Sequence, residues 1–176
     1  KNYSMKICFL DRDGVIIKDV HYIKKIKDVK FTRGIFEGLR KIQNLNYKIC
    51  IVTNQSGIAR GYLKEKKLKT IHNYIKKEFL KKNIKFKKIS YCPHHPFASV
   101  NKYKKNCNYR KPKPGMIIKI LQKNKNVSID ECFLIGDKIT DIQAGRKAGL
   151  KKNFLLQKGM NFNNFIKKLI FLGKIN

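Results

Sequence analysis

Short apolar runs alternate along the chain with segments of helical periodicity. The apolar runs are continuous, rich in β-branched residues and too short for helices, which is typical of strands buried on both faces of a parallel sheet. Five such runs are present, at residues 6–10, 47–53, 89–92, 131–136 and 153–157. We therefore expect five buried strands.

Between these runs, apolar residues recur every three or four positions, as they do on the buried face of a helix. Pro114 stands where one helix would begin, and Gly149 where another would end. The predicted helical stripes start at Ile35, Leu68, Met116, Ile142 and Phe162. This alternation predicts an α/β fold, a doubly wound parallel sheet with helices on both faces and ligands at the carboxyl ends of its strands.

The domain organisation follows from length and from one irregular segment. With 176 residues, 42% of them hydrophobic, the chain can build one core, so we expect a single domain over residues 1–176. The irregular stretch at 93–114 holds all four prolines. A loop of that length in a compact domain is usually functional, so we expect a short inserted loop and no large cap domain.

The cellular setting is inferred from apolar runs and cysteines. Runs such as 49–52 and 133–135 fall far short of the ~20 residues that a membrane helix needs. An acidic motif at residue 11 leaves no room before it for a signal peptide. We expect a cytoplasmic monomer without a membrane partner. The five cysteines are an odd number, which favours reduced thiols or a metal over disulfides.

The formal charge of +31 would ordinarily indicate a nucleic-acid partner. Only 6 of the 42 basic residues are Arg, however, and the forked guanidinium of Arg dominates base recognition. The chain holds 36 Lys, 24 Ile and 16 Asn, the residues of A/T-rich codons, so we favour drift in codon composition. We expect no specific nucleic-acid partner, and nonspecific, salt-sensitive RNA binding as a side effect.

Candidate catalytic groups follow the ends of the predicted strands. Asp11 and Asp13 follow the first strand in LDRDG, which alone is equally compatible with a turn before Gly14. The second strand leads into VTNQSG, whose hydroxyl, amide and backbone donors suit phosphate oxygens. RKPKP brings cations to the start of the third helix. The fourth strand ends in GDKITD, which contains Asp137 and Asp141.

Four of the eleven acids are thus concentrated at two strand ends. A buried cluster of carboxylates needs a counter-charge, and Mg²⁺ is favoured because a phosphate can supply further oxygen ligands. The residues therefore indicate phosphate chemistry on an aspartate, assisted by a divalent cation.

The order of these motifs resembles that of the haloacid dehalogenase superfamily of phosphatases, over nearly the whole chain. More closely, LDRDGVI, VTNQSGIARG, YCPHHP, NYRKPKPGM and IGDKITDIQAG resemble the D-glycero-D-manno-heptose 1,7-bisphosphate phosphatase family, with the related histidinol-phosphatases next. Taken together, these motifs are highly specific. The resemblance implies a Mg²⁺-dependent phosphatase that removes the anomeric or adjacent phosphate of a sugar bisphosphate in heptose synthesis for lipopolysaccharide.

The resemblance also implies a role for each matching residue. Asp11 would attack phosphorus and become an aspartyl phosphate, while Asp13 would act as general acid and then as general base. Mg²⁺ would be held by Asp11, Asp137 and the backbone carbonyl of Asp13. The phosphoryl oxygens would contact Thr53 and Lys111. The sugar and its second phosphate would face the side chains of Asp19, Tyr22, Asn54, Gln55, Ser56 and Arg110.

For Lys138, a solvated surface position and a ligand role remain equally open. The other histidines, His21 and His72, suggest no function, and His72 is expected on the surface of a helix. Cys8 and Cys50, like Cys132, lie inside predicted strands and are expected in the core.

In the heptose bisphosphate phosphatase family that this sequence resembles, the loop after the third strand carries a zinc-binding pattern, Cys-x-His…Cys-x-Cys. Cys92, His94 and Cys107 occupy three of its places, and Tyr109 stands in the fourth. A neutral Tyr is a poor ligand, and structural zinc sites are normally closed by four donors. His95 or a water could complete the site, or the loop could be held by packing and prolines without metal.

Two rival functions remain open. One is histidinol-phosphate hydrolysis. The other is a nucleic-acid-binding or 3′-phosphate-processing protein, supported by the charge but opposed by the scarcity of Arg and by the absence of an aromatic-basic stacking motif.

Overall fold

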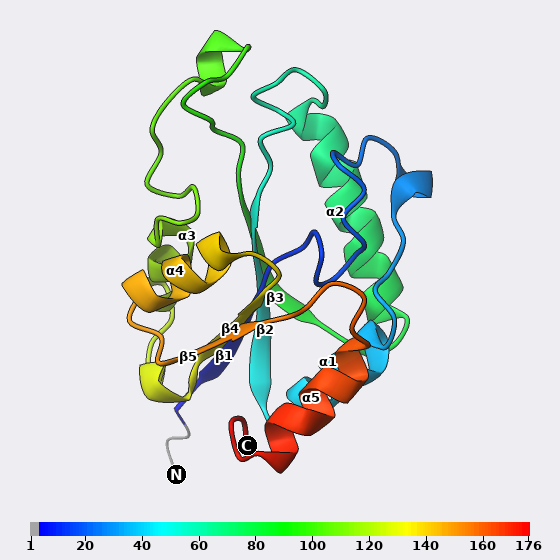
Figure 1. Ribbon diagram of the computed structural model, residues 1–176, viewed down its shortest axis with the longest axis vertical. Coiled ribbons are helices and arrows are strands. Elements are labelled where there is room, and N and C mark those ends of the chain that lie inside the picture. The colour runs from blue at the N-terminus through cyan, green and yellow to red at the C-terminus, as the bar shows by residue number, and fades with distance from the viewer. Residues whose placement is uncertain (1–3) are drawn as a thin grey trace.

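The centre of the protein is a five-stranded parallel sheet in the order β3-β2-β1-β4-β5, seen in a computed structural model that describes residues 4–176 (Figure 1). Its strands are β1 (Lys6–Leu10), β2 (Tyr47–Asn54), β3 (Phe86–Cys92), β4 (Phe133–Gly136) and β5 (Lys152–Leu155). The doubly wound parallel sheet expected from the alternating elements is confirmed.

Helices cover both faces of this sheet (Figure 1). One face carries α1 (Ile35–Asn44), α2 (Glu65–Leu80) and α5 (Phe162–Phe171). The other carries α3 (Gly115–Gln122) and α4 (Ile139–Lys147). Three short 3₁₀ turns lie at Ile26–Asp28, Asn101–Tyr103 and Ile129–Glu131.

Successive residues of β1 face opposite layers, which explains its unbroken apolar run. Cys8 and Leu10 pack into the core beneath α1, α2 and α5, whereas Ile7 and Phe9 pack beneath α3 and α4. All four side chains are fully buried. A strand buried on both faces has no polar position, as the sequence pattern indicated.

The order of the strands places a ligand site beside β1. The chain runs outward from β1 through β2 to β3, and then returns to the other side of β1 to form β4 and β5. The loops that leave β1 and β4 therefore diverge at adjacent carboxyl ends, and such a switch point is where open α/β sheets bind ligands.

The predicted boundaries shift mainly at the edges of the sheet. β3 begins at Phe86, three residues before the predicted start, because Lys87 and Lys88 are exposed on an edge strand and interrupt the apolar run. Residues 129–131 form a 3₁₀ turn, so that β4 begins at Phe133. Gly149, with φ of +89°, follows the end of α4 as expected.

The loop between β3 and α3 rises away from the sheet at the top of the view in Figure 1. Glu65 at the start of α2 joins this loop to β3, because it accepts from Tyr103 Oη in the 3₁₀ turn (2.8 Å) and from Tyr91 Oη in β3 (2.6 Å). No large cap is evident in the part of the chain that the structure describes. Within residues 4–176, no helix has both the length and the apolar character needed to cross a membrane.

Candidate active site

A cleft of about 270 Å³ opens at the carboxyl ends of β1 and β4. It brings together segments that are far apart in the sequence: the loop after β1, the end of β2, the segment before α3 and the start of α4. Its lining residues are Asp11, Arg12, Asp13, Asp19, His21, Tyr22, Asn54, Gln55, Ser56, Arg110, Lys111, Lys138, Thr140 and Asp141. The cleft therefore collects the polar motifs that the sequence analysis singled out.

A buried ammonium group lies between two carboxylates at the floor of this cleft. Lys111 Nζ donates to Asp11 Oδ1 (2.8 Å), to Val52 O (2.7 Å) and to Asp141 Oδ1 (2.6 Å). Burial alone would lower the pKa of Lys111, but the two carboxylates outweigh burial and raise it. Lys111 is therefore a cation, aimed at the carboxylate of Asp11.

Three carboxylates form a second group around Asp11. One oxygen each of Asp11, Asp137 and Asp141 lies within 4.8 Å of the other two. Asp137 Oδ1 is buried and has no hydrogen-bond partner within residues 4–176. Burial, reinforced by Asp11, raises the pKa of Asp137 to about 7. Clustered oxygens of which one is orphaned fit a hard divalent cation, which would supply the missing counter-charge.

Gly14 is required by the closeness of this packing. It has φ of +86°, and a Cβ at this position would lie 2.2 Å from Asp137 Oδ2. The LDRDG turn can therefore approach the carboxylate of Asp137 only because residue 14 has no side chain.

Asp13 is held apart from the carboxylate group by a buried arginine. Arg12 Nη2 donates to both carboxylate oxygens of Asp13 at 2.9 Å, and Arg12 Nε donates to Oδ1 at 3.2 Å. Gln55 Nε2 donates to Asp13 Oδ2 and to Thr53 Oγ1, both at 2.9 Å. The Asp13 side chain thus lines the cleft with its orientation fixed from two sides.

His72 lies behind Arg12, so its predicted place on the surface is wrong. The His72 side chain is only 6% exposed, and its Nε2 lies 3.1 Å from Arg12 Nη1. Burial, together with the charge of Arg12, lowers the pKa of His72 to about 3. The imidazole of His72 is therefore neutral. The face of α2 that carries His72 is turned toward the interior and not toward solvent.

The rim of the cleft carries the groups expected to face a substrate. Lys138 Nζ donates to Asp19 Oδ2 at 3.1 Å, which supports a site position for Lys138 over a purely solvated one. Burial opposes ionisation of Asp19, but hydrogen bonds from Lys138 and from His21 N outweigh it and lower the pKa of Asp19. Arg110 Nη1 donates to His94 O at 3.3 Å.

The backbone of Lys111 is fixed by Asn54. Asn54 Nδ2 donates to Lys111 O, and Lys111 N donates to Asn54 Oδ1, each at 3.0 Å. Thr53, which is predicted with Lys111 to contact the phosphoryl oxygens, is buried like Lys111, and its hydroxyl accepts from Gln55. The paired bonds of Asn54 position the backbone of Lys111.

Known proteins are similar to this chain in sequence and in fold. Residues 6–165 match the family described as polynucleotide kinase 3 phosphatase. From Photorhabdus laumondii, D-glycero-alpha-D-manno-heptose-1,7-bisphosphate 7-phosphatase is 43% identical over 156 residues, 89% of this chain and 85% of that protein. The corresponding beta-anomer enzyme of that organism is 37% identical over 155 residues, 88% of this chain and 82% of that protein.

The chain belongs to the heptose 1,7-bisphosphate phosphatase family, and it has the fold of a haloacid dehalogenase-like phosphatase. The resemblance inferred from its motifs is thereby confirmed, and the protein is a phosphatase, a hydrolase of phosphoric monoesters. The fold agrees: the D,D-heptose 1,7-bisphosphate phosphatase from B. bronchiseptica, solved with magnesium and phosphate, matches with a TM-score of 0.77 at 24% identity. That match covers 96% of this chain and 99% of the other.

Several residues of the phosphatase cleft were not assigned a role from the sequence. Asp141 was noticed as one of four clustered acids, and its position three residues after Lys138 at the start of α4 could have revealed it. There Asp141 Oδ2 accepts from Lys138 N at 3.0 Å. Arg12 and His21 also line the cleft, and nothing in their spacing separated them from ordinary loop residues.

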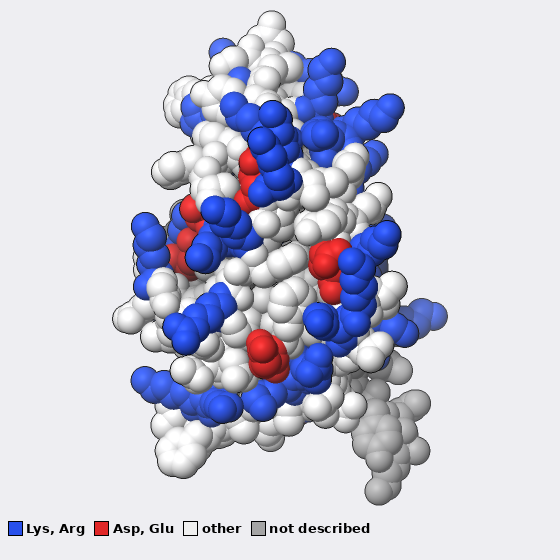
Figure 2. Space-filling model, turned by 90° about the vertical axis from the view of Figure 1, so that its right-hand side faces the viewer, with Lys and Arg blue, Asp and Glu red and all other residues white. Residues whose placement is uncertain are grey.

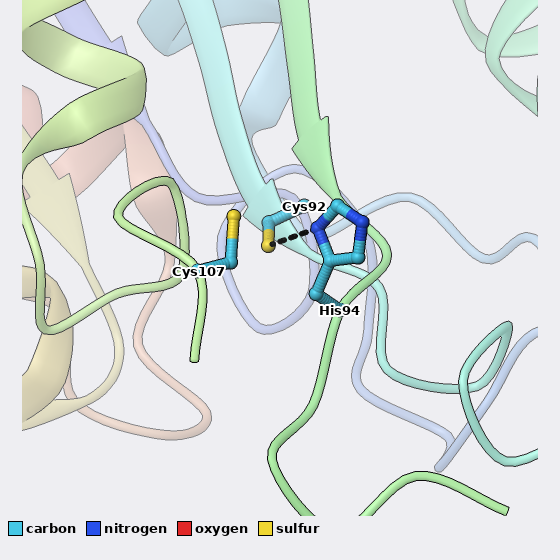
Figure 3. Close-up of side chains that lie close together, drawn as sticks. All are labelled: Cys92, His94 and Cys107. Carbon is cyan, nitrogen blue, oxygen red and sulfur yellow. Dashed lines mark hydrogen bonds between the residues drawn. The ribbon is translucent and has the colours of Figure 1, made fainter. Parts of the chain in front are cut away.

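The phosphatase gathers three potential zinc ligands at the end of β3 (Figure 3). Cys92 Sγ, His94 Nδ1 and Cys107 Sγ lie within 4.8 Å of one another. Tyr109 lies instead against Lys119, whose Nζ is 5.0 Å from its ring centroid. His95 Nδ1 accepts from the backbone N of Phe97 at 3.1 Å.

No fourth Cys, His or carboxylate joins this cluster within residues 4–176. Closed structural zinc sites use four donors, so these three do not fit such a site. All five cysteines are free thiols, and each is buried. The expected placement of Cys8, Cys50 and Cys132 in the core is confirmed.

The positive charge of the phosphatase is dispersed on the face drawn in Figure 2. Lys and Arg side chains lie over this whole face, separated by uncharged surface and by a few acids. Basic side chains spread in this way over a face attract polyanions weakly and without selectivity there.

We predict that His72 makes the stability of the phosphatase pH-dependent. Its pKa is about 3 in the folded state and about 6.5 in the unfolded state, so the stability it contributes is complete above pH 6.5 and is lost as the pH falls toward 3. Relative to His72→Gln, which does not titrate, wild type should lose about 1.4 kcal/mol of unfolding free energy between pH 7.5 and 5.5. Urea unfolding of both proteins measures this difference, and a pH-independent gap would contradict the prediction.

We predict that the three-donor cluster holds zinc weakly and that Tyr109→Cys tightens the site. A third thiolate would be the fourth donor, and it would close the tetrahedron that Cys92, His94 and Cys107 leave open. Elemental analysis after dialysis against a chelator should find zinc retained by Tyr109→Cys and lost from wild type. Tyr109→Ser is the matched control and should behave as wild type does; a full equivalent of zinc retained by wild type would show that a fourth ligand exists.

Proposed function

We propose that the phosphatase hydrolyses the 7-phosphate of a D-glycero-D-manno-heptose 1,7-bisphosphate through an aspartyl phosphate on Asp11. The observation that carries the proposal is the buried Asp11–Lys111 pair, placed at the switch point of the sheet beneath a rim of polar groups. The relatives described above are named 7-phosphatases, which favours the 7-phosphate over the anomeric or adjacent phosphate that the motif resemblance implied.

Asp11 is suited to nucleophilic attack because Lys111 supplies a counter-charge at its carboxylate. Burial raises the pKa of Asp11 above its ordinary value, and the charge of Lys111 with its hydrogen bond counters only part of that rise. Lys111 also supplies positive charge next to the point where a phosphoryl group would meet Asp11 Oδ. Splitting the hydrolysis into attack by Asp11 and later attack by water replaces one difficult displacement with two easier ones.

The carboxylates of Asp11, Asp137 and Asp141, with the backbone carbonyl of Asp13, would hold Mg²⁺. When bound, the cation neutralises the approach of an anionic phosphate to an anionic nucleophile and stabilises the charge of the transferring group. The magnesium named in the B. bronchiseptica complex supports Mg²⁺ as the cation. The orphaned oxygen of Asp137 supports it independently.

Asp13 is proposed as the acid that protonates the departing sugar oxygen and as the base that activates water in the second step. One residue can serve both steps because the proton given up in the first is recovered in the second. Asp13 lines the cleft in a fixed orientation, which such proton transfers require.

The rim is proposed to bind the sugar and its second phosphate. Arg110 offers a guanidinium fork, Lys138 a further cation, and the side chains of Asp19, Tyr22, Asn54, Gln55 and Ser56 offer hydrogen-bonding partners for hydroxyls. The proposed mechanism does not involve zinc.

A phosphate-release screen tests the proposed substrate. It compares both anomers of the heptose bisphosphate with histidinol phosphate and a 3′-phosphorylated oligonucleotide, the last because the matching family is described as polynucleotide kinase 3 phosphatase. We expect the highest kcat/KM on a heptose bisphosphate. A preference for the oligonucleotide or for histidinol phosphate would overturn the proposal in favour of that substrate.

We predict that Asp11→Asn abolishes turnover without unfolding the protein, since the change is nearly isosteric but removes the attacking carboxylate. Wild-type activity should disappear with EDTA and return with added Mg²⁺. Asp130→Asn is the matched control, because Asp130 is exposed and pairs with the exposed Lys151, and it should keep full activity. More than a few per cent of the wild-type rate in Asp11→Asn would refute covalent catalysis by this residue.

We predict that Arg110→Ala weakens binding of the bisphosphate in particular. Loss of charge-assisted hydrogen bonds to the second phosphate should raise KM for the bisphosphate about tenfold or more, and KM for the heptose 7-phosphate less than about threefold. Steady-state kinetics on both sugars measures the difference. Arg40→Ala, on the exposed face of α1, serves as the control, and equal losses on both sugars would exclude this role for Arg110.

A further inference from the structure

Arg12 is a fully buried cation that the mechanism so far does not use. Its side chain is 2% exposed although it stands in the loop after β1, directly between the two aspartates of LDRDG. A buried guanidinium is costly unless its charge and its donors are satisfied. The partners that satisfy Arg12 therefore indicate why it is buried here.

The negative partner of Arg12 is Asp13. Arg12 Nη2 reaches Asp13 Oδ1 and Oδ2 at 2.9 Å each, and Nε reaches Oδ1 at 3.2 Å. Gln55 Nε2 holds Oδ2 from a second direction at 2.9 Å. A carboxylate held by a guanidinium and by an amide cannot rotate freely, so the Asp13 carboxyl group that lines the cleft keeps one orientation there.

The other end of the guanidinium meets a neutral acceptor. Arg12 Nη1 lies 3.1 Å from His72 Nε2, and an arginine can only donate, so Nε2 must be the unprotonated nitrogen of the ring. His72 comes from α2, sixty residues away in the sequence, and its ring lies edge-on to Tyr91 with 5.8 Å between centroids. An uncharged partner fixes the guanidinium without competing with Asp13 for its charge.

We propose that Arg12 and His72 are positioning residues for the general acid, His72 fixing Arg12 and Arg12 aiming the carboxylate of Asp13 at the leaving-group oxygen. This inference rests on the proposed function, which makes Asp13 the acid. It assigns α2 a part in catalysis, although no residue of α2 lines the cleft.

The test uses the leaving group, because a misplaced acid harms only reactions that need its proton. A sugar alkoxide must be protonated as it departs, whereas 4-nitrophenolate leaves readily without a proton. We compare kcat/KM for the best sugar phosphate of the screen with kcat/KM for 4-nitrophenyl phosphate. This parameter reports the steps up to phosphoryl transfer and is unaffected by the later hydrolysis of the aspartyl phosphate.

Arg12→Lys keeps the charge but loses the fork, so kcat/KM should fall about 10- to 100-fold on the sugar phosphate and less than about threefold on 4-nitrophenyl phosphate. His72→Phe should show the same selective loss, because it leaves a buried Arg12 donor without an acceptor. His72→Gln, whose amide oxygen can accept from Arg12, should recover most of the activity on the sugar phosphate.

Two reference variants make the outcomes distinguishable. Asp13→Asn shows the selectivity expected when the acid is absent. Ile75→Val is a buried change one turn further along α2 and reports loosening of that helix alone. It should lower kcat/KM equally on both substrates or leave both values unchanged. Circular dichroism checks each fold, and if Arg12→Lys fails to fold, the comparison of His72→Phe with His72→Gln decides the question.

The positioning roles would be overturned if Asp13→Asn lost kcat/KM on the sugar phosphate alone, while Arg12→Lys and His72→Phe lost it equally on both substrates. The proposed function would then remain intact. Equal losses in Asp13→Asn itself would instead reject Asp13 as the acid, and the positioning inference would fall with it. Loss in Ile75→Val as selective as in His72→Phe would also overturn the inference, because a general loosening of α2 would then explain the effect.

Discussion

The ammonium group of Lys111 is the contact on which the arrangement of the cleft depends. It joins Asp11 after β1, the carbonyl of Val52 in β2 and Asp141 at the start of α4, so that three separate segments converge on one atom. Each carboxylate would be costly to bury alone, and removing one member of such a group leaves an uncompensated charge. The same contacts that hold the sheet and helix together therefore create the charged floor at which phosphate chemistry is proposed.

Electrostatic pairing also separates the roles of two nearby aspartates. Asp11 lies among Lys111, Asp137 and Asp141, where its carboxylate can face both a cation and a phosphoryl group. Asp13, two residues later, is drawn to Arg12 and Gln55 on the other side of the turn. One strand end thus presents two carboxylates in different surroundings, which is how a nucleophile and an acid can share a short motif.

The sequence predicted what depends on local pattern and could not predict what depends on long-range packing. Buried strands such as β1 were found because burial on both faces leaves a continuous apolar run. The start of β3 was missed because an edge strand exposes Lys87 and Lys88 and loses that signature. The position of His72 was predicted wrongly because a polar residue on a helix usually indicates an exposed position. Its partner is a buried arginine sixty residues away, which the local pattern does not reveal. The pairing of Lys111 with Asp141 likewise became visible only once the strands were ordered.

The dispersed lysine coat makes ionic strength act on this protein in two opposite directions. With a net charge of +31, the folded chain repels itself more strongly than a more expanded chain would, so added salt should stabilise the fold by screening that repulsion. The same field would draw the proposed substrate, a doubly phosphorylated sugar, toward the cleft, and salt would weaken that attraction. Salt that stabilises the fold therefore slows the association of the ligand. The best working salt concentration is a compromise between the stability of the fold and the rate of ligand binding.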